Sequence, residues 1–183
     1  MANVTTRTAN WRLFGGGGLA LGGLLWTLSW TLAMAKVPTV PSWLFVVGLI
    51  IVAVALVFVA FGETGSNGAV GKYTLGKLAL VLYAAGWLLL GVSAAQYLGS
   101  VVAGIAGVLI IVGGFAAAYT VYQKHVAKGA ARAILFAPAV LGTFYALGLW
   151  IPEIGGLVWL SLPIALAFLV TGVLYLFNDR RIG

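Results

Sequence analysis

Long, nearly uninterrupted apolar stretches, separated by short polar turns, dominate the hydrophobic pattern of this chain. A transmembrane helix needs about 20 mostly apolar residues, because each residue adds about 1.5 Å to a helix and the hydrocarbon core is about 30 Å thick. Six stretches meet this requirement, at residues 13–35, 42–61, 75–97, 101–122, 133–151 and 154–177. The pattern therefore predicts an all-α, polytopic transmembrane helix bundle, with residues 1–183 forming a single domain.

The polar segments between these stretches are short, with one exception. Residues 62–72 read GETGSNGAVGK, which is rich in glycine and has no apolar periodicity. Such a composition is typical of a loop, and we expect residues 62–72 to be flexible. Pro138 and several small residues interrupt the fifth stretch, which makes it the least regular of the predicted helices.

Composition supports the membrane interpretation. Of the 183 residues, 63% are hydrophobic and 7% are charged, whereas soluble domains contain roughly 45–50% apolar and about 25% charged residues. A soluble fold of this size has no core large enough to hide so much apolar surface. The chain also has no cysteine, which excludes disulfides, thiolate catalysis and cysteine-ligated metals.

The positive charges are distributed asymmetrically across the predicted spans. Lys36 lies on one side, together with Glu153. The other side holds the remaining nine basic residues, Arg7, Arg12, Lys72, Lys77, Lys124, Lys128, Arg132, Arg180 and Arg181. Lysine and arginine accumulate on the cytoplasmic side of membrane proteins. We therefore expect both termini and the 62–72 loop in the cytoplasm, with the protein in the cell (cytoplasmic) membrane.

The basic residues do not form a run interleaved with exposed aromatics, so nucleic acid is not an expected partner. The aromatic residues fit the same layout as the charges, since tryptophan and tyrosine prefer the two membrane interfaces. The residues expected at the outer interface are Trp30, Trp43, Trp150 and Trp159, and those at the inner interface are Tyr73, Tyr119, Tyr122 and Tyr175.

Similar segments recur along the chain. Residues 51–54, 111–114 and 169–172 are spaced by 60 and 58 residues, and Trp26, Trp87 and Tyr145 are spaced by 61 and 58. Either three helical hairpins follow one plan, or an apolar chain matches itself by chance.

Three successive hairpins, each ending in a helix of the type Gly-x-Leu-Ile-Ile-Val-Gly-Gly (residues 107–114), resemble the HdeD-like small membrane proteins, which are linked to acid stress. The resemblance covers most of the chain and implies a bundle of three hairpins. It supplies no catalytic residue to carry over, and the 62–72 loop has no counterpart in the family pattern.

Clustered glycines in the first span have the composition of a phosphate-binding loop but not its pattern. No Gly-Lys-Ser/Thr follows residues 15–18, and Ala20 occupies the position where a GxGxxG motif needs its third glycine. A helix-packing role explains them instead, because Gly18 and Gly22, four residues apart, let a neighbouring backbone approach closely. We expect the same role on the fourth span for its small residues Ala103, Gly107 and Gly114.

Acidic residues are scarce, and this scarcity argues against an enzyme. Glu63, Glu153 and Asp179 are the only ones, and all three fall in loops or at a helix end. Hydrolytic carboxylate pairs, carboxylate metal sites and proton relays all need acidic groups inside the bundle. The single histidine, His125, lies in a basic segment and is expected to be solvated. We expect no catalytic residue, metal or cofactor.

Polar side chains within the spans are the remaining candidates for a site. An outward-facing pocket rimmed by Trp26, Trp30 and Trp150 is one interpretation, suited to a lipid, quinone, pigment or small neutral solute. Its candidate ligand-binding residues are Thr27, Trp30, Ser93, Gln96, Thr143 and Ser161. The alternative is that these groups bond to their own or a neighbouring helix, contributing roughly 0.6 kcal/mol each.

Two functions follow from these features. The first is a non-enzymatic structural or accessory bundle that acts through lateral contacts with membrane lipids, other membrane-protein subunits or copies of itself. The alternative is a pore or carrier for a small neutral or apolar molecule, working through the outer-half pocket.

Overall fold

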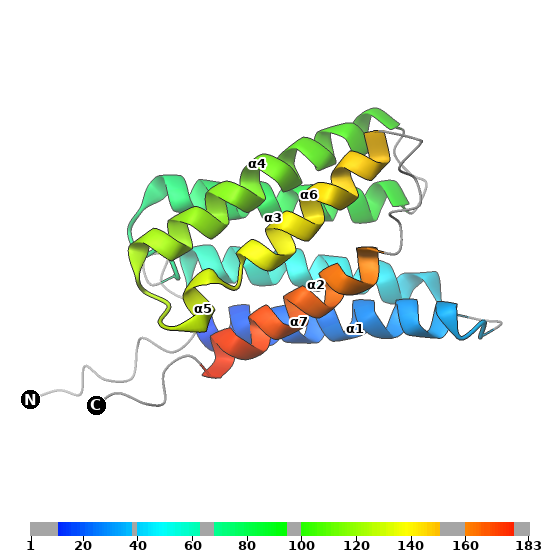
Figure 1. The fold of residues 1–183 in the computed structure, drawn as a ribbon, viewed down its shortest axis with the longest axis horizontal. Coiled ribbons are helices and arrows are strands. Elements are labelled where there is room, and N and C mark those ends of the chain that lie inside the picture. Colours follow the sequence, from blue (N-terminus) through cyan, green and yellow to red (C-terminus); the bar gives the residue numbers. More distant parts are fainter. Residues whose placement is uncertain (1–10, 38–39, 63–67, 95–99, 151–159, 178–183) are drawn as a thin grey trace, which may run out of the picture.

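The computed structural model describes residues 11–37, 40–62, 68–94, 100–150 and 160–177. These residues form helices and connecting turns without a strand, which confirms the predicted all-α class (Figure 1). A π-helical turn (Trp11–Gly16) runs directly into the first helix. The α-helices are α1 (Gly17–Met34), α2 (Ser42–Phe61), α3 (Thr74–Ala94), α4 (Ser100–Lys124), α5 (Ala130–Ala133), α6 (Phe136–Trp150) and α7 (Ser161–Phe177).

Five helical segments are long and apolar enough to cross a membrane: α1 with its π-helical turn, α2, α3, α4, and α5 with α6. The sixth, α7, has 17 residues and so extends about 26 Å, close to the thickness of the hydrocarbon core. The predicted start of this span, at residue 154, lies outside the described residues.

Two prolines mark helix starts instead of interrupting helices. Pro138 is the third residue of α6, and Pro163 is the third residue of α7. The backbone N–H groups of a first helical turn have no partner within the helix, so proline removes no hydrogen bond there. The irregularity expected around Pro138 lies just before it, where α5 ends at Ala133 and α6 begins at Phe136.

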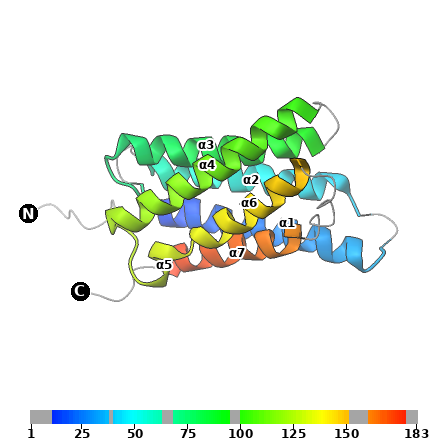
Figure 2. The ribbon, with the colours of Figure 1, turned by 45° about the horizontal axis from the view of Figure 1, so that its top comes forward.

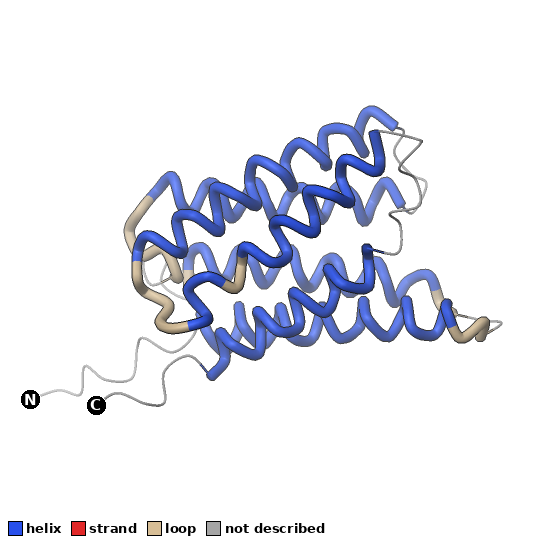
Figure 3. The backbone as a smooth tube through the Cα atoms, in the orientation of Figure 1, coloured by secondary structure: helices blue, strands red, loops and turns tan. Residues whose placement is uncertain are grey.

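The six long helices form a closed ring. Each packs against its neighbours in the order α1, α2, α3, α4, α6 and α7, and α7 returns to α1. Figure 1 shows α1, α2 and α7 on one side of the bundle and α3, α4 and α6 on the other, and Figure 2 shows the same bundle turned by 45°. Figure 3 shows the described loops at the two ends of the bundle.

The glycine-rich first helix lies very close to α2. The residues that face α2 are Gly15, Gly18 and Gly22, which recur at helical spacing. A Cβ atom built on Gly18 would lie 2.7 Å from the Cβ of Ala55, and one on Gly22 would lie 2.8 Å from the carbonyl oxygen of Gly48. Both positions are closer than side chains tolerate, so only glycine permits this approach.

A second glycine face of the same helix contacts α7. A Cβ atom on Gly23 would lie 2.6 Å from the backbone nitrogen of Leu169. Gly16 likewise meets the backbone of α7, and Gly172 meets the backbone of α1 at Ala20. The glycine cluster thus serves two helix interfaces at once and brings the last helix onto the first.

Part of the 62–72 segment is packed onto the bundle. Residues 63–67 lie outside the described residues, but Gly68, Ala69 and Val70 are buried. The backbone N–H of Ala69 donates a 2.7 Å hydrogen bond to the carbonyl of Val59 in α2. The described end of this segment is therefore anchored, because small residues let its backbone approach the helix.

We predict that Gly23→Ala destabilises the protein, although alanine is the better helix former by about 1 kcal/mol. The new methyl group meets backbone atoms of α7 that cannot move away, and overpacking of this kind costs about 1–3 kcal/mol. Gly17→Ala is the matched control, because its Cβ meets only the end of the Leu176 side chain at 3.8 Å. Thermal melting in mild detergent should show a lower Tm for Gly23→Ala alone. Equal Tm values for both variants would contradict the proposed contact.

Candidate functional site

The described basic residues are divided between the two ends of the bundle. One end comprises the starts of α1, α3 and α6 and the ends of α2, α4 and α7 (Figure 1). It carries six of them, namely Arg12, Lys72, Lys77, Lys124, Lys128 and Arg132. At the opposite end, Lys36 follows α1. The structure therefore separates these residues as the predicted topology does. Arg7, Arg180 and Arg181 lie outside the described residues.

Four of these cations lie over aromatic rings, and two of them make close contacts. The ammonium nitrogen of Lys124 lies 3.9 Å from the centre of the Tyr73 ring, and the guanidinium carbon of Arg132 lies 4.0 Å from that of Tyr122. Arg132 also donates to the Tyr122 carbonyl at 2.5 Å and to His125 Nε2 at 3.0 Å. An arginine can only donate, so this His125 nitrogen is an acceptor.

Four aromatic side chains fill the centre of the ring of helices. This central aromatic cluster consists of Trp26 from α1, Tyr83 and Trp87 from α3, and Phe168 from α7, all fully buried. The Trp26 and Trp87 ring centres lie 5.3 Å apart, and those of Trp87 and Phe168 lie 5.5 Å apart, both in edge-to-face geometry. Such pairs attract each other through the positive edge and negative face of the rings.

The cluster corrects one expectation for an individual aromatic residue. Trp26, predicted at the rim of an outward-facing pocket, is in the middle of the core instead. Tyr175, predicted near the inner membrane interface, is the third residue from the end of α7 at the basic end of the bundle, and its side chain is fully buried with its ring 5.5 Å from that of Trp11. The rim position predicted for Trp26 was wrong, because its ring packs against Trp87 of α3 and Phe168 of α7.

The threonines of the predicted pocket bond to their own helices. The hydroxyl of Thr27 donates to the Gly23 carbonyl at 2.7 Å, and that of Thr143 donates to the Ala139 carbonyl at 2.9 Å. Ser161 is fully buried at the start of α7. The two threonine hydroxyls thus take part in helix packing, whereas the Ser161 hydroxyl has no hydrogen-bond partner among the described residues.

Trp30 is the pocket candidate that lines a hollow. Together with Ser29, Ala33 and Phe45 it borders a hollow of about 200 Å³ between α1 and α2. The side chain of Ser93 and the whole of Gln96 lie outside the described residues. Of the four candidates whose side chains the structure describes, Trp30 is the one that borders this hollow.

Small residues of α4 lie against aromatic rings. A Cβ atom on Gly107 would lie 3.0 Å from the Trp150 ring, and one on Gly114 would lie 2.9 Å from the Tyr83 ring. Ala103 is half-buried. The tightest approach belongs to Gly113, which was not among the predicted packing residues and faces the Tyr83 backbone nitrogen at 2.6 Å. Its signal was visible as the first residue of the Gly113–Gly114 pair.

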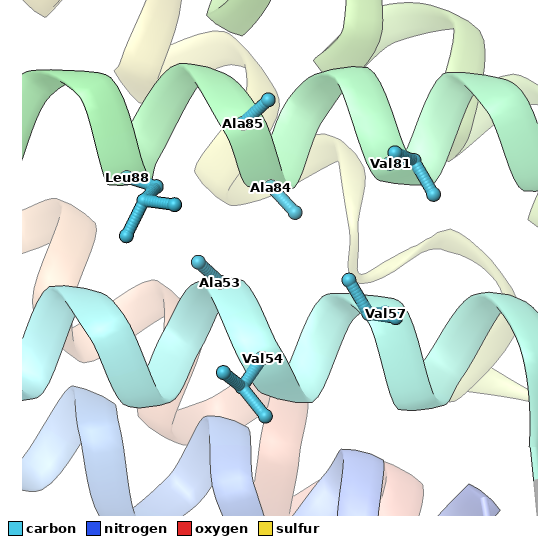
Figure 4. Close-up of a pocket in the computed structure, with 7 residues that line it drawn as sticks. All are labelled: Ala53, Val54, Val57, Val81, Ala84, Ala85 and Leu88. Carbon is cyan, nitrogen blue, oxygen red and sulfur yellow. The ribbon is translucent and has the colours of Figure 1, made fainter.

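An apolar groove runs between α2 and α3 on the outer surface of the bundle (Figure 4). Its volume is about 240 Å³. We call it the α2–α3 groove and define it by its lining residues Ala53, Val54, Val57, Val81, Ala84, Ala85 and Leu88. The alanines leave space between the two helices, whereas Val54, Val57 and Leu88 are exposed at its edges. Sequence analysis missed this groove because alanine is common throughout the chain.

The chain was compared with protein families, curated proteins and solved structures. No family model, no curated protein and no solved structure matches it.

Proposed function

We propose that this protein is a non-enzymatic membrane bundle that acts through lateral contacts with lipids or membrane-protein partners. The observation that carries the proposal is the central aromatic cluster. Fully buried rings from α1, α3 and α7 occupy the middle of the ring of helices, where a pore or carrier would need a passage. The surfaces available for contact are then the outer faces of the helices.

Those outer faces are strongly apolar. On α4 the exposed large side chains recur every three or four residues, which places them on one face of the helix. They are Val101, Ile105, Val108, Val112, Phe115, Tyr119 and Tyr122. Such a stripe fits acyl chains or the apolar face of another membrane helix.

Four threonine hydroxyls within the described helices also support a packing role. Thr27, Thr120, Thr143 and Thr171 each donate to a carbonyl of their own helix. A hydroxyl engaged in this way has no donor left for a substrate. We therefore propose that the bundle carries out no acid–base or nucleophilic chemistry.

The charge asymmetry supports a definite orientation. We propose that the basic end of the bundle lies in the cytoplasm, together with both termini, and that the protein resides in the cell (cytoplasmic) membrane. Six described cations at one end against Lys36 at the other follow the rule that lysine and arginine accumulate on the cytoplasmic side.

Single cysteines in this cysteine-free chain should report the orientation. Ala35→Cys and Ala130→Cys are suitable, because both positions are exposed and lie at opposite ends of the bundle. An impermeant thiol reagent added to intact cells should label the Ala35→Cys variant and spare the Ala130→Cys variant. After membrane permeabilisation both should react. The reverse labelling pattern in intact cells would overturn the proposed orientation.

Flux measurements test the function itself. In reconstituted vesicles we expect no saturable uptake of small neutral solutes such as glycerol or urea. A carrier has to replace the solute's hydrogen bonds to water, since a buried unpaired polar group costs several kcal/mol. Gln96→Leu combined with Ser93→Ala removes two candidate polar side chains in the third predicted span, and we expect this double variant to behave like the unmodified protein. Saturable flux that the double variant loses would establish the carrier function instead.

A further inference from the structure

We propose that the α2–α3 groove holds one acyl chain of an anionic phospholipid, with the lipid phosphate beside Lys77. This inference rests on the proposed function and specifies one of the lateral contacts. It depends on the apolar lining of the groove, on its position between two membrane-spanning helices, and on the cation at its basic end.

The groove suits a narrow hydrocarbon chain. Its lining consists of alanine, valine and leucine side chains, which offer no hydrogen bond. Along α3 it extends from Val81 to Leu88, a rise of about 10 Å. Figure 4 shows Ala53 and Val57 of α2 pointing toward Ala84 and Val81 of α3, with Leu88 at the far end. Small side chains in the middle and larger ones at the edges give the groove an elongated shape.

Lys77 lies beyond the end of the α2–α3 groove, toward the basic end of the bundle. It lies four residues before Val81, so the two side chains share one face of α3. Its ammonium nitrogen lies 5.5 Å from the centre of the Phe61 ring, and Phe61 lies four residues after Val57 on α2. Lys77 and Phe61 therefore meet across the same two helices that form the groove, about 6 Å beyond Val81.

Charge and depth together favour an anionic lipid as the occupant. Lys77 is the fourth residue of α3, within the first turn of a membrane-spanning helix, where an amphipathic lysine side chain reaches the headgroup level. Anionic lipids are attracted to basic residues near the membrane surface. Water is a poor occupant of the groove, because the lining offers it no hydrogen-bond partner. An empty groove is also unfavourable, because the lining side chains would lack dispersion contacts on one side. An acyl chain of the lipid fills the α2–α3 groove while the phosphate of the same lipid lies beside Lys77.

The test uses the full chain reconstituted into vesicles of equal parts phosphatidylcholine and phosphatidylglycerol. After gentle extraction into mild detergent, the retained phospholipids are quantified by mass spectrometry. We expect phosphatidylglycerol to be enriched about fivefold over phosphatidylcholine, as for a single lysine–lipid charge contact. Lys77→Gln should abolish most of the enrichment, and Lys77→Arg should preserve it. Ala85→Leu, which enlarges a residue that lines the groove, should reduce the amount of retained lipid by half or more.

Matched controls separate the groove from general surface effects. Lys72→Gln removes an exposed cation at the same end, and Ala116→Leu enlarges an exposed alanine on α4 away from the groove. Both should retain the lipid profile of the unmodified protein, and melting measurements should confirm that all variants fold. Equal loss of enrichment in Lys72→Gln, or no enrichment in the unmodified protein, would overturn the lipid assignment.

A second copy of the chain is the competing occupant. If Ala85→Leu halves the particle mass in light scattering, the groove receives another protomer and the lipid assignment fails, whereas lateral contact as the function stands. Failure of the proposed function would instead appear as saturable solute flux in the separate vesicle assay. The two outcomes are therefore distinguishable.

Discussion

Close backbone contact between α1 and its two neighbours is the constraint on which the rest of the structure depends. In a bilayer, burying an apolar side chain against another helix gains little over leaving it in lipid, so tight packing has to hold helices together. Gly18 and Gly22 provide that contact with α2, and Gly16 and Gly23 provide it with α7. Because α7 is the last helix among the described residues, its docking on α1 closes the ring.

Closing the ring determines where function can reside. With α1 held between α2 and α7, Trp26 points into the centre and meets Trp87 and Phe168. The interior is then filled by aromatic rings, and the surface left for recognition is the outer one. The α2–α3 groove and its neighbouring lysine are features of that surface, which is why the proposed function and the proposed lipid site both concern lateral contacts.

Hydropathy was sufficient to locate the membrane-spanning helices, because the thickness of the bilayer sets the length of each apolar stretch. It was not sufficient to identify their inward faces, since lipid-facing and core-facing side chains are equally apolar. Tyr175 illustrates the difficulty, because an interfacial and a buried tyrosine look alike in sequence. Glycine spacing was a better guide, and the positions of Gly18 and Gly22 pointed to a packing face. The three-hairpin repeat and the HdeD-like resemblance stay predictions.

The candidate sites were less predictable, because they depend on how two helices meet. The α2–α3 groove exists because Ala53 of α2 lies near Ala84 of α3. These two residues are far apart in sequence, so the sequence alone does not show that they meet. In sequence, Thr27 and Thr143 fitted either a ligand pocket or bonding within their own helices, and the structure shows the bonds within their own helices. In sequence Lys77 is one of nine basic residues on one predicted side of the membrane, and its place at the end of a groove required the structure.

Cross-linking of the first and last helices in the membrane tests the central claim most directly. A Cβ atom on Gly17 lies 3.8 Å from a terminal methyl group of Leu176, so both positions accept a small side chain without a clash. The Gly17→Cys and Leu176→Cys pair, bridged by a short bifunctional thiol reagent, should give a fast-migrating intramolecular product. A Gly17→Cys and Val112→Cys pair should give none, because Val112 is exposed on α4. Cross-linking of the control pair, or none between α1 and α7, would contradict a closed ring.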